Sequence, residues 1–486
     1  MPVTEAVIRS VVQEVLAELR GQRASRATGD RQLGAAADGK EGRYGLFSRV
    51  EDAVAAAAEA QKKLQAAGSE ARARAVACIR RICIEQAEPL GREEFAETRI
   101  GRLDHKIEKM RITGERIPGV EFLQTHAYSG SQGLTLVEYA PFGVIGVVTP
   151  VTHSLPTLAG NAINMIAAGN ALVCNPHPSG AGVARHGVEL FNRAIHRETG
   201  IDNLIAVITE PTLETAQALF DHREVKLLCV TGGPAVGRAA LSSRKRAIVA
   251  GPGNPPVVVD ETADLEHAAR CIVRGAAYDN NLLCIGEKQV FAVASIFDEL
   301  CAAMEAAGAV RLADAQIEQL TRVAFVRQGE GTRERLVVNK ELIGQDPEVL
   351  AQRAGFSLPR RTELLFGETS AEHPFVQEEQ MMPFVPFVRV PDVDTAIEWA
   401  RRSEHGFRHT AIIHSRNVDA ITAMARALDT TLFVANGPCM AALGIEGEGY
   451  LSYSIATPTG EGVTTPLTFT RQRRLSVARG ALCIAR

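Results

Sequence analysis

Short runs of β-branched and aliphatic residues alternate with helical patterns over most of the chain. The runs LTLVEYAPFGVIGVVTP, NALVCNPHP, NLIAVITE, VKLLCVTGG and RAIVAGPG are separated by helical stretches such as GVARHGVELFNRAIHRETG. A second set with the same rhythm begins near NPPVVVD and includes TELLFGE, MMPFVPFVRV, HTAIIHS and TLFVANG. Alternation of strand, helix and strand predicts doubly wound, mainly parallel sheets. The pattern therefore predicts an α/β protein with two such domains.

The first twenty residues form a separate amphipathic pattern. Apolar side chains recur at offsets of three and four between Ile8 and Leu19, with charged residues opposite them, which predicts a helix over residues 1–20. Residues 21–43 are rich in Gly, Ala and charge, so we expect a flexible linker. An isolated helix of this length is marginal in water. Its apolar stripe needs a surface, either on this protein or a subunit partner, or on another protein that the helix docks onto as a tag.

The remaining boundaries follow from changes in pattern. Residues 45–126 are mainly helical, and we assign residues 44–250 to a first domain, whose doubly wound sheet is of the kind that can bind a dinucleotide. Residues 251–444 form the second domain. Residues 445–486 look extended and poor in core residues, which is more typical of an arm than of a domain.

Composition excludes several classes of function. The net charge is −4 and the basic residues are spread along the chain, which argues against nucleic acid or anionic lipid as partners. No segment approaches the roughly 20 apolar residues that span a bilayer, and acidic residues occupy the N-terminus, so we expect a cytoplasmic protein. The nine cysteines lack CxxC spacing, which predicts reduced core residues and no metal site.

Two segments carry candidate chemistry. The stretch CVTGGPAVGRAAL follows a strand and opens a helix, so the amides around Gly232, Gly233 and Gly237 could meet a pyrophosphate. It does not match GxGxxG, and an ordinary strand-to-helix turn is the alternative. Cys284, in YDNNLLCIGEKQVF, follows a polar loop at a helix end, where a lowered pKa and exposure can coexist. The alternative for this cysteine is core packing.

Several motifs resemble those of a known family in order and spacing. These are PFGVIGVVTP, IAAGNALVCNPHPSG, VTGGPAVGR, NNLLCIGEK, EEQMMPFVPFV, EHGFRHTAIIHS, NGP and PTGEGVTTPLTFTRQRR. From about residue 45 to the end, the chain resembles the aldehyde dehydrogenase superfamily. Within it, the chain is most similar to the CoA-acylating aldehyde dehydrogenases of bacterial microcompartments.

The resemblance implies a role for Cys284 as the nucleophile. Its thiolate would attack the aldehyde to give a thiohemiacetal, hydride would leave to the nicotinamide, and a thioester would remain. The cofactor contacts that the resemblance implies are Thr231, Gly232, Gly233, Glu379, Pro176 and His177. Asn175 replaces the lysine that ordinary members place on the adenosine ribose, so NAD is expected and NADP is not excluded.

Two departures from the family pattern bear on the chemistry. Ala250, 34 residues before Cys284, stands where water-using members carry the glutamate that activates water. Its absence favours thiolysis of the thioester by coenzyme A over hydrolysis. His153, in TPVTHSLPT, stands where acylating relatives carry an asparagine that donates to the oxyanion. An imidazole N–H could replace that donor; otherwise His153 lines the substrate pocket, or the register differs by one and nominates Thr152.

The resemblance implies NAD-dependent, CoA-acylating oxidation of propionaldehyde, acetaldehyde or lactaldehyde in the lumen of a bacterial microcompartment. Residues 1–20 resemble an encapsulation peptide that docks onto a shell protein. The hairpin near residues 130–142 and the C-terminal arm resemble oligomerisation strands, which implies a homodimer or homotetramer. Two alternatives are a hydrolytic aldehyde dehydrogenase that gives a free acid, and an inactive microcompartment cargo protein.

Overall fold

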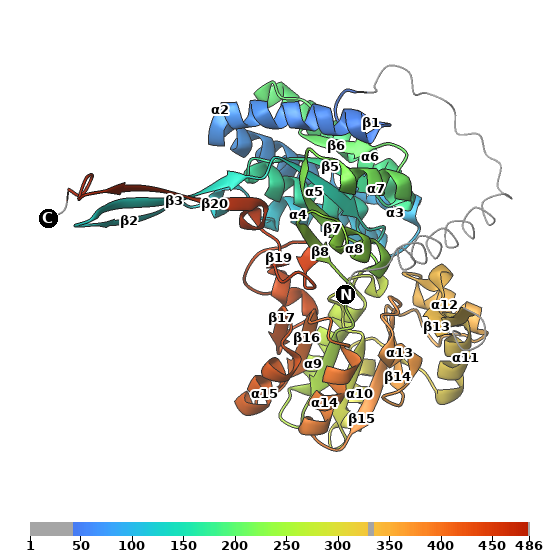
Figure 1. Cartoon of the computed structure of the whole chain (residues 1–486). Coiled ribbons are helices and arrows are strands. Elements are labelled where there is room, and N and C mark those ends of the chain that lie inside the picture. Colours follow the sequence, from blue (N-terminus) through green and yellow to red (C-terminus); the bar gives the residue numbers. More distant parts are fainter. Residues whose placement is uncertain (1–41, 329–334, 485–486) are drawn as a thin grey trace, which may run out of the picture.

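The computed structural model describes residues 42–328 and 335–484. The predicted helix over residues 1–20 and nearly all of the predicted linker lie outside the described residues. Two separate parallel sheets with helices packed against them make up the body of the molecule (Figure 1). The predicted α/β class with two parallel-sheet units is confirmed.

The first sheet has six parallel strands in the order β1-β6-β5-β4-β7-β8. Its strands are β1 (Leu46–Phe47), β4 (Val144–Thr149), β5 (Ala171–Pro176), β6 (Ile205–Ile208), β7 (Val225–Thr231) and β8 (Ala247–Ala250). Every residue of β4, β5 and β6 is buried, as expected for strands that are covered on both faces. This two-sided burial explains why these strands appear in the sequence as continuous apolar runs.

Helices pack against the first sheet and extend its core. They are α2 (Val50–Glu85), α3 (Ala87–Thr98), α4 (Leu103–Arg116), α5 (Ser154–Ala167), α6 (Ala181–Thr199), α7 (Leu213–Asp221) and α8 (Pro234–Leu241). The long helix α2 is interrupted at Gly68, whose φ of 79° and ψ of −167° are not helical. Its apolar side contacts α5 and α6. Helix α4 packs against α2, α3 and α5, which places its inner face deep in the protein.

The second sheet has seven parallel strands in the order β11-β14-β15-β10-β9-β16-β17. They are β9 (Pro256–Val259), β10 (Gln289–Val293), β11 (Val310–Arg311), β14 (Leu365–Glu368), β15 (Phe384–Val390), β16 (Thr410–His414) and β17 (Leu432–Ala435). Its helices are α9 (Leu265–Ala276), α10 (Phe297–Ala306), α11 (Asp314–Ala324), α12 (Pro347–Ala354), α13 (Pro374–Gln377), α14 (Val393–Ser403) and α15 (Val418–Leu428). A hairpin of β12 (Phe325–Gln328) and β13 (Arg335–Val338) lies between α11 and α12.

The chain crosses from the first sheet to the second through residues 251–255, between β8 and β9. Because parallel strands share one orientation, the carboxyl ends of β4, β5, β7 and β8 all lie at the same edge of the first sheet. In open α/β sheets, ligands bind outside this edge. The crossing segment therefore joins the ligand-binding edge of one sheet to the other sheet.

A three-stranded antiparallel sheet projects from the body as an arm (Figure 1). Its strands are β2 (His126–Gly130), β3 (Gly133–Pro141) and β20 (Thr470–Ala478). The sequence analysis expected an arm from residue 445 onward, and this boundary is wrong. Leu451, Tyr453 and Phe469 are buried in the core, and the arm strand begins only at Thr470.

Two further expectations concern the whole chain. Among residues 42–328 and 335–484, no helix has the length and apolar character to cross a membrane. The cysteines that lie in apolar sequence are buried and not joined in disulfides. These are Cys78, Cys83, Cys174, Cys229 and Cys271.

Candidate active site

Cys284 lies in the segment between the short helix η3 (Tyr278–Asn281) and β10. The thiol is partly exposed, unlike most cysteines of the chain. Enclosure by protein raises its pKa to about 12; the nearby Glu379 carboxylate adds to this effect, while Lys288 and backbone N–H groups oppose it. The position of Cys284 in a polar loop at a helix end does not lower its pKa, because burial and a neighbouring carboxylate outweigh the favourable charge of Lys288. The resting thiol is protonated near neutral pH.

The three residues Asp279, Asn280 and Asn281 adopt left-handed backbone conformations in succession, with φ values of 50°, 55° and 64°. Asp and Asn tolerate this region better than other residues with a side chain. The Asn281 amide donates to the carbonyl oxygens of Ala276 and Glu287, at 2.9 Å each, and so closes the turn. These three residues therefore form the turn that precedes Cys284.

Gly253, in the crossing segment, is the point where the backbone of Cys284 and the side chains of Glu379 and His409 meet. A Cβ atom at Gly253 would lie 2.5 Å from the Cys284 carbonyl oxygen and 2.9 Å from Cγ of His409. The Gly253 N–H donates to the carboxylate of Glu379. Cys284 and Glu379, which the sequence analysis assigned to one site, are therefore brought together, and His409 joins them.

Lys288 forms hydrogen bonds with the backbone that leads to Cys284. This buried lysine donates to the carbonyl oxygens of Asn281 at 2.7 Å and Leu283 at 3.1 Å. Burial raises the pKa of the nearby Glu379 to about 7, against the opposing effect of the Lys288 charge. The site thus contains a carboxyl group whose pKa is raised to near neutrality, beside a buried lysine whose own pKa is lowered by burial.

His409 was given no role in the sequence analysis, although its motif EHGFRHTAIIHS was part of the resemblance. Its Nδ1 lies 2.8 Å from the Thr410 hydroxyl oxygen, and its buried Nε2 has no hydrogen-bond partner among the described residues. Burial, assisted by the Lys288 charge, lowers its pKa to about 4, so the ring is neutral near pH 7. The motif contains several histidines, and spacing alone does not indicate which one reaches Cys284.

His153 lies at the N-terminal end of α5, following β4. Its carbonyl oxygen accepts from the amide of Thr157 at 3.1 Å and from the Thr157 hydroxyl at 2.7 Å, which fixes the backbone. The ring lies 5.3 Å from the Tyr453 ring, and its Nδ1 has no partner within the described part of the chain. Burial lowers the His153 pKa well below its usual value, and Lys109 and Lys106 reinforce the effect. His153 is therefore a neutral imidazole whose Nδ1 makes no hydrogen bond within the described residues.

A buried cluster of charged side chains connects the loop that precedes His153 to the turn that precedes Cys284. It consists of Lys106 and Lys109 on α4, Glu94 on α3 and Asp279 before Cys284. Burial alone would raise the Asp279 pKa, but the two lysines outweigh it and hold that pKa well below its usual range. Burial raises the Glu94 pKa and lowers the Lys109 pKa to about 8. The sequence analysis missed this cluster, because lysines in a helical pattern are usually solvent-exposed.

The expected cofactor loop lies at the carboxyl end of β7. The Thr231 hydroxyl oxygen is 2.7 Å from that of Ser454, so this side chain bonds to the protein interior. Gly232 and Gly233 lead into α8, and a Cβ atom at Gly233 would have no described atom within 4 Å. The backbone here is open on one side at a helix N-terminus, which fits a dinucleotide phosphate.

The other expected cofactor residues lie at the end of β5 on the same edge. Oδ1 of the Asn175 side chain accepts from the Thr215 hydroxyl at 2.6 Å, and Nδ2 of the same side chain donates to the Thr212 carbonyl oxygen at 3.3 Å. Pro176 ends β5, and Nδ1 of His177 accepts from the next turn of the backbone. Strands β4 and β7 separate β5 from β8, so these residues lie across the edge from Gly253.

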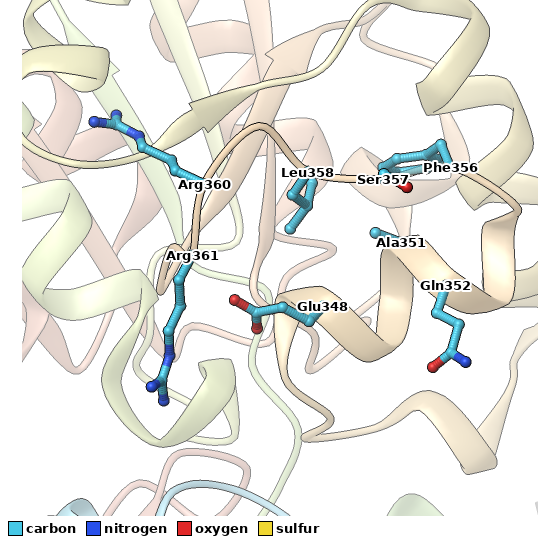
Figure 2. Close-up of a pocket in the computed structure, with 8 residues that line it drawn as sticks. All are labelled: Glu348, Ala351, Gln352, Phe356, Ser357, Leu358, Arg360 and Arg361. Carbon is cyan, nitrogen blue, oxygen red and sulfur yellow. The ribbon is translucent and has the colours of Figure 1, made fainter.

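An open cavity of about 650 Å³ lies elsewhere, beside α12. Figure 2 shows the Glu348 carboxylate on the side of Arg361, with Arg360 extending away from Phe356. Arg360 donates to the carbonyl oxygens of Glu305 and Ala309, so it joins this loop to α10. None of the sequence-predicted site residues lines this cavity. The residues that do are Glu348, Ala351, Gln352, Phe356, Ser357, Leu358, Arg360 and Arg361.

Comparisons with known proteins agree with this arrangement. Residues 44–450 match the model of the aldehyde dehydrogenase family. The chain is 44% identical over 483 residues to an acetaldehyde dehydrogenase (acetylating) of Bilophila wadsworthia, covering 98% of this chain and 99% of the relative.

Two solved structures are similar over 90% of this chain. One is the propionaldehyde dehydrogenase of Rhodopseudomonas palustris with bound CoA and an acylated cysteine, at 43% identity and a TM-score of 0.86, covering 90% of this chain and 98% of that one. The other is a propionaldehyde dehydrogenase from the fucose utilisation bacterial microcompartment of Clostridium phytofermentans. It is 41% identical with a TM-score of 0.87, and the match covers 90% of this chain and 99% of that chain.

Proposed function

Because the chain belongs to the aldehyde dehydrogenase family, we propose that it oxidises a short-chain aldehyde to the corresponding acyl-coenzyme A. The observation that carries this proposal is the meeting of Cys284, Glu379 and His409 at Gly253, on a crossing segment that begins after Ala250. Cys284 supplies the nucleophile beside this segment, and Ala250 at the start of the segment offers no carboxylate to activate water. The Glu379 carboxylate is already hydrogen-bonded to Gly253 and faces the charge of Lys288.

The reaction passes through a thioester on Cys284. The Cys284 thiol gives its proton to the neighbouring Glu379 carboxylate in our assignment, and the resulting thiolate adds to the aldehyde carbonyl. The carbonyl oxygen that becomes negative accepts a hydrogen bond from the N–H of His153. A bound nicotinamide supplies the acceptor for the hydride that leaves the former aldehyde carbon. The thiol of coenzyme A then displaces Cys284 from the acyl group. The sum is aldehyde, oxidised cofactor and coenzyme A going to acyl-coenzyme A, reduced cofactor and a proton.

We assign His409 as the group that receives the proton of the incoming coenzyme A thiol. Its neutral ring and its unpartnered Nε2 are suited to accept a proton, and it packs on the Gly253 backbone beside Cys284. A lowered pKa of about 4 makes it a weak base, but it keeps the ring unprotonated throughout the neutral range.

The proposed cofactor is NAD, held at the carboxyl edge of the first sheet. Gly233 leaves room for a phosphate at the start of α8, while Pro176 and His177 border the adenosine side in this proposal. Asn175 is uncharged and bonded to Thr212 and Thr215, so it offers no cation to a 2′-phosphate. Initial rates with NAD and NADP, each at saturation, test this choice.

One assay tests the activity. Purified protein receives acetaldehyde, propionaldehyde or lactaldehyde with NAD, with and without coenzyme A, and reduced cofactor and thioester are measured. Coenzyme A-dependent formation of both supports the proposal, and steady turnover to a free acid without coenzyme A contradicts it. The Cys284→Ala protein is the control, and it should be inactive while remaining folded.

We further propose that the enzyme works in the lumen of a bacterial microcompartment and that residues 1–20 dock onto a shell protein. The amphipathic pattern of this segment and the similarity to an enzyme of a microcompartment support the proposal. Deleting residues 1–20 should leave kcat unchanged and abolish copurification with assembled shells. Retained copurification would contradict the docking role.

The arm supports a proposal of a homodimer or homotetramer. All residues of β2 are exposed, including the large side chain of Tyr128, and Leu475 on β20 is exposed as well. An exposed sheet of this kind with apolar side chains is a pairing surface. Light scattering of the full chain should give a mass of two or four subunits, and deletion of residues 470–486 should reduce it.

A further inference from the structure

Two lysines on α4 are fully buried, and their hydrogen bonds go to Thr152 and Asp279, which have no part in the chemistry proposed above. Lys106 is 1% exposed and Lys109 is 0% exposed. Burying an ammonium group is costly unless it is paired and hydrogen-bonded. The partners of these two lysines are therefore informative about their role.

Both lysines contact the loop that ends at Thr152 and the turn that begins at Asp279. Nζ of Lys106 donates to the Thr152 carbonyl oxygen at 2.6 Å, and Nζ of Lys109 donates to the same oxygen at 3.3 Å. On the other side, Lys106 lies 3.2 Å from Oδ2 of Asp279, and Lys109 donates to that same oxygen. Thr152 directly precedes His153, and Asp279 begins the polar turn that leads to Cys284.

The Asp279 end of this bridge is held from further directions by the start of α4. Oδ1 of Asp279 accepts from the Arg102 amide at 2.8 Å, and the Asp279 N–H donates to Nδ1 of His105 at 2.8 Å. Asp279 has a φ of 50°, a conformation that persists in a folded protein only when surrounding contacts enforce it. Helix α4 supplies those contacts.

We infer that Lys106 and Lys109 are positioning residues that join the loop of His153 to the turn before Cys284 and so fix the oxyanion donor relative to the thiol. This inference rests on the proposed function, because that function gives His153 and Cys284 their roles. The shared acceptors, the Thr152 carbonyl and the Asp279 carboxylate, mean that neither loop moves without breaking a buried charged hydrogen bond.

The same lysines reinforce the effect of burial on the charge state of His153. The groups that face its ring are Lys106 and Lys109 from α4, Asp279 from the turn before Cys284, and the Tyr453 ring. Burial is the largest influence that lowers the His153 pKa, the two lysines add to it, and Asp279 opposes them. His153 is thereby kept neutral, so that it acts as a hydrogen-bond donor and not as a second cation.

The test is a double-mutant cycle. Lys109→Met should lower kcat by about 100-fold, the order expected for an error of about 1 Å in a reacting geometry, and should change KM for the aldehyde much less. In a His153→Ala background the same substitution should lower kcat by less than about threefold, because the donor it positions is gone. Equal losses in the two backgrounds, or an unchanged kcat in the single variant, would overturn the inference.

Folding is controlled separately. Lys109→Met leaves Asp279 short of one partner, so the pair variant Lys109→Met with Asp279→Asn removes both members together and is used if the single variant does not fold. Leu300→Ala is the matched control, since it opens a cavity on α10, remote from both loops. It should lower Tm and leave kcat unchanged.

A readout independent of turnover separates this inference from the proposed function. The His153 imidazole is followed by ¹⁵N NMR over pH, with its signal assigned by its loss in His153→Ala. Removing the Lys109 charge should raise the His153 pKa toward its usual value, whether or not the protein uses coenzyme A. An unchanged titration would overturn the electrostatic role of Lys109. Absence of coenzyme A-dependent turnover in the wild-type protein would refute only the proposed function.

Discussion

Replacing Gly253 with alanine tests the geometry of the site with a single methyl group. The φ of Gly253 lies outside the left-handed region, so alanine is compatible with the backbone. The new Cβ would lie 2.5 Å from the Cys284 carbonyl oxygen and 2.9 Å from Cγ of His409. Both contacts are far below an ordinary van der Waals distance, so the Cys284 segment or the His409 ring must move.

The size of the effect follows from these distances. To reach 3.4 Å, the Cys284 carbonyl must withdraw by about 0.9 Å. A misplacement of about 1 Å at a reacting centre costs about 100-fold in rate, or about 2.7 kcal/mol of transition-state free energy. Inserting one methyl group into a packed site should also lower the free energy of unfolding by about 1–3 kcal/mol.

The assay is coenzyme A-dependent formation of reduced cofactor from propionaldehyde, with Tm measured in parallel. Gly251→Ala is the matched control in the same segment, because its Cβ would meet the Pro458 ring at 2.9 Å and no residue of the site. It should retain most of the wild-type kcat. A Gly253→Ala enzyme with wild-type kcat would refute the close packing of Cys284 and His409 on this glycine.

Three further predictions concern single residues. Since the Cys284 pKa is raised to about 12, the rate of its alkylation by iodoacetamide in the resting enzyme should rise about tenfold per pH unit between pH 7 and pH 10, and a plateau near neutrality would contradict the raised pKa. Ala250→Glu should introduce acid formation without coenzyme A, whereas the isosteric Ala250→Gln should not; the same acid yield from both variants would exclude water activation by the new carboxylate. Asn281→Ala should have a lower free energy of unfolding than Asn281→Gly by about 1 kcal/mol, because only glycine relieves the cost of the φ of 64°. Equal Tm values for these two variants would show that this conformation carries no strain.

Much of the fold was predictable because the strands of both sheets are covered on each face, so β4 or β9 appears as an uninterrupted apolar run. The uninterrupted apolar character also concealed the boundary between β3 and β4. The run LTLVEYAPFGVIGVVTP contains β3 of the arm and β4 of the first sheet, and its apolar character does not change where the chain leaves the arm. The segment before Thr470 was misjudged for a different reason, since its buried apolar residues alternate with polar residues that are buried as well, such as Ser452 and Ser454.

For the site, motif order was enough to nominate Cys284 and Glu379, and the structure brings them together at Gly253. It was not enough for Lys106 or Lys109, because burial of a charge depends on partners that come from distant segments. The run DNN before Cys284 did carry a usable signal. Consecutive Asp and Asn residues are the types that best tolerate a positive φ, and here all three have one.

The central claim is that the thioester on Cys284 is stable to hydrolysis and is cleaved by coenzyme A. The most direct test is mass spectrometry of the protein after reaction with propionaldehyde and NAD, first without and then with coenzyme A. The account predicts a propanoyl group on the peptide that contains Cys284, stable until coenzyme A is added and then released as propanoyl-coenzyme A. A peptide that loses the acyl group equally fast without coenzyme A, or that carries it on another residue, would contradict the account.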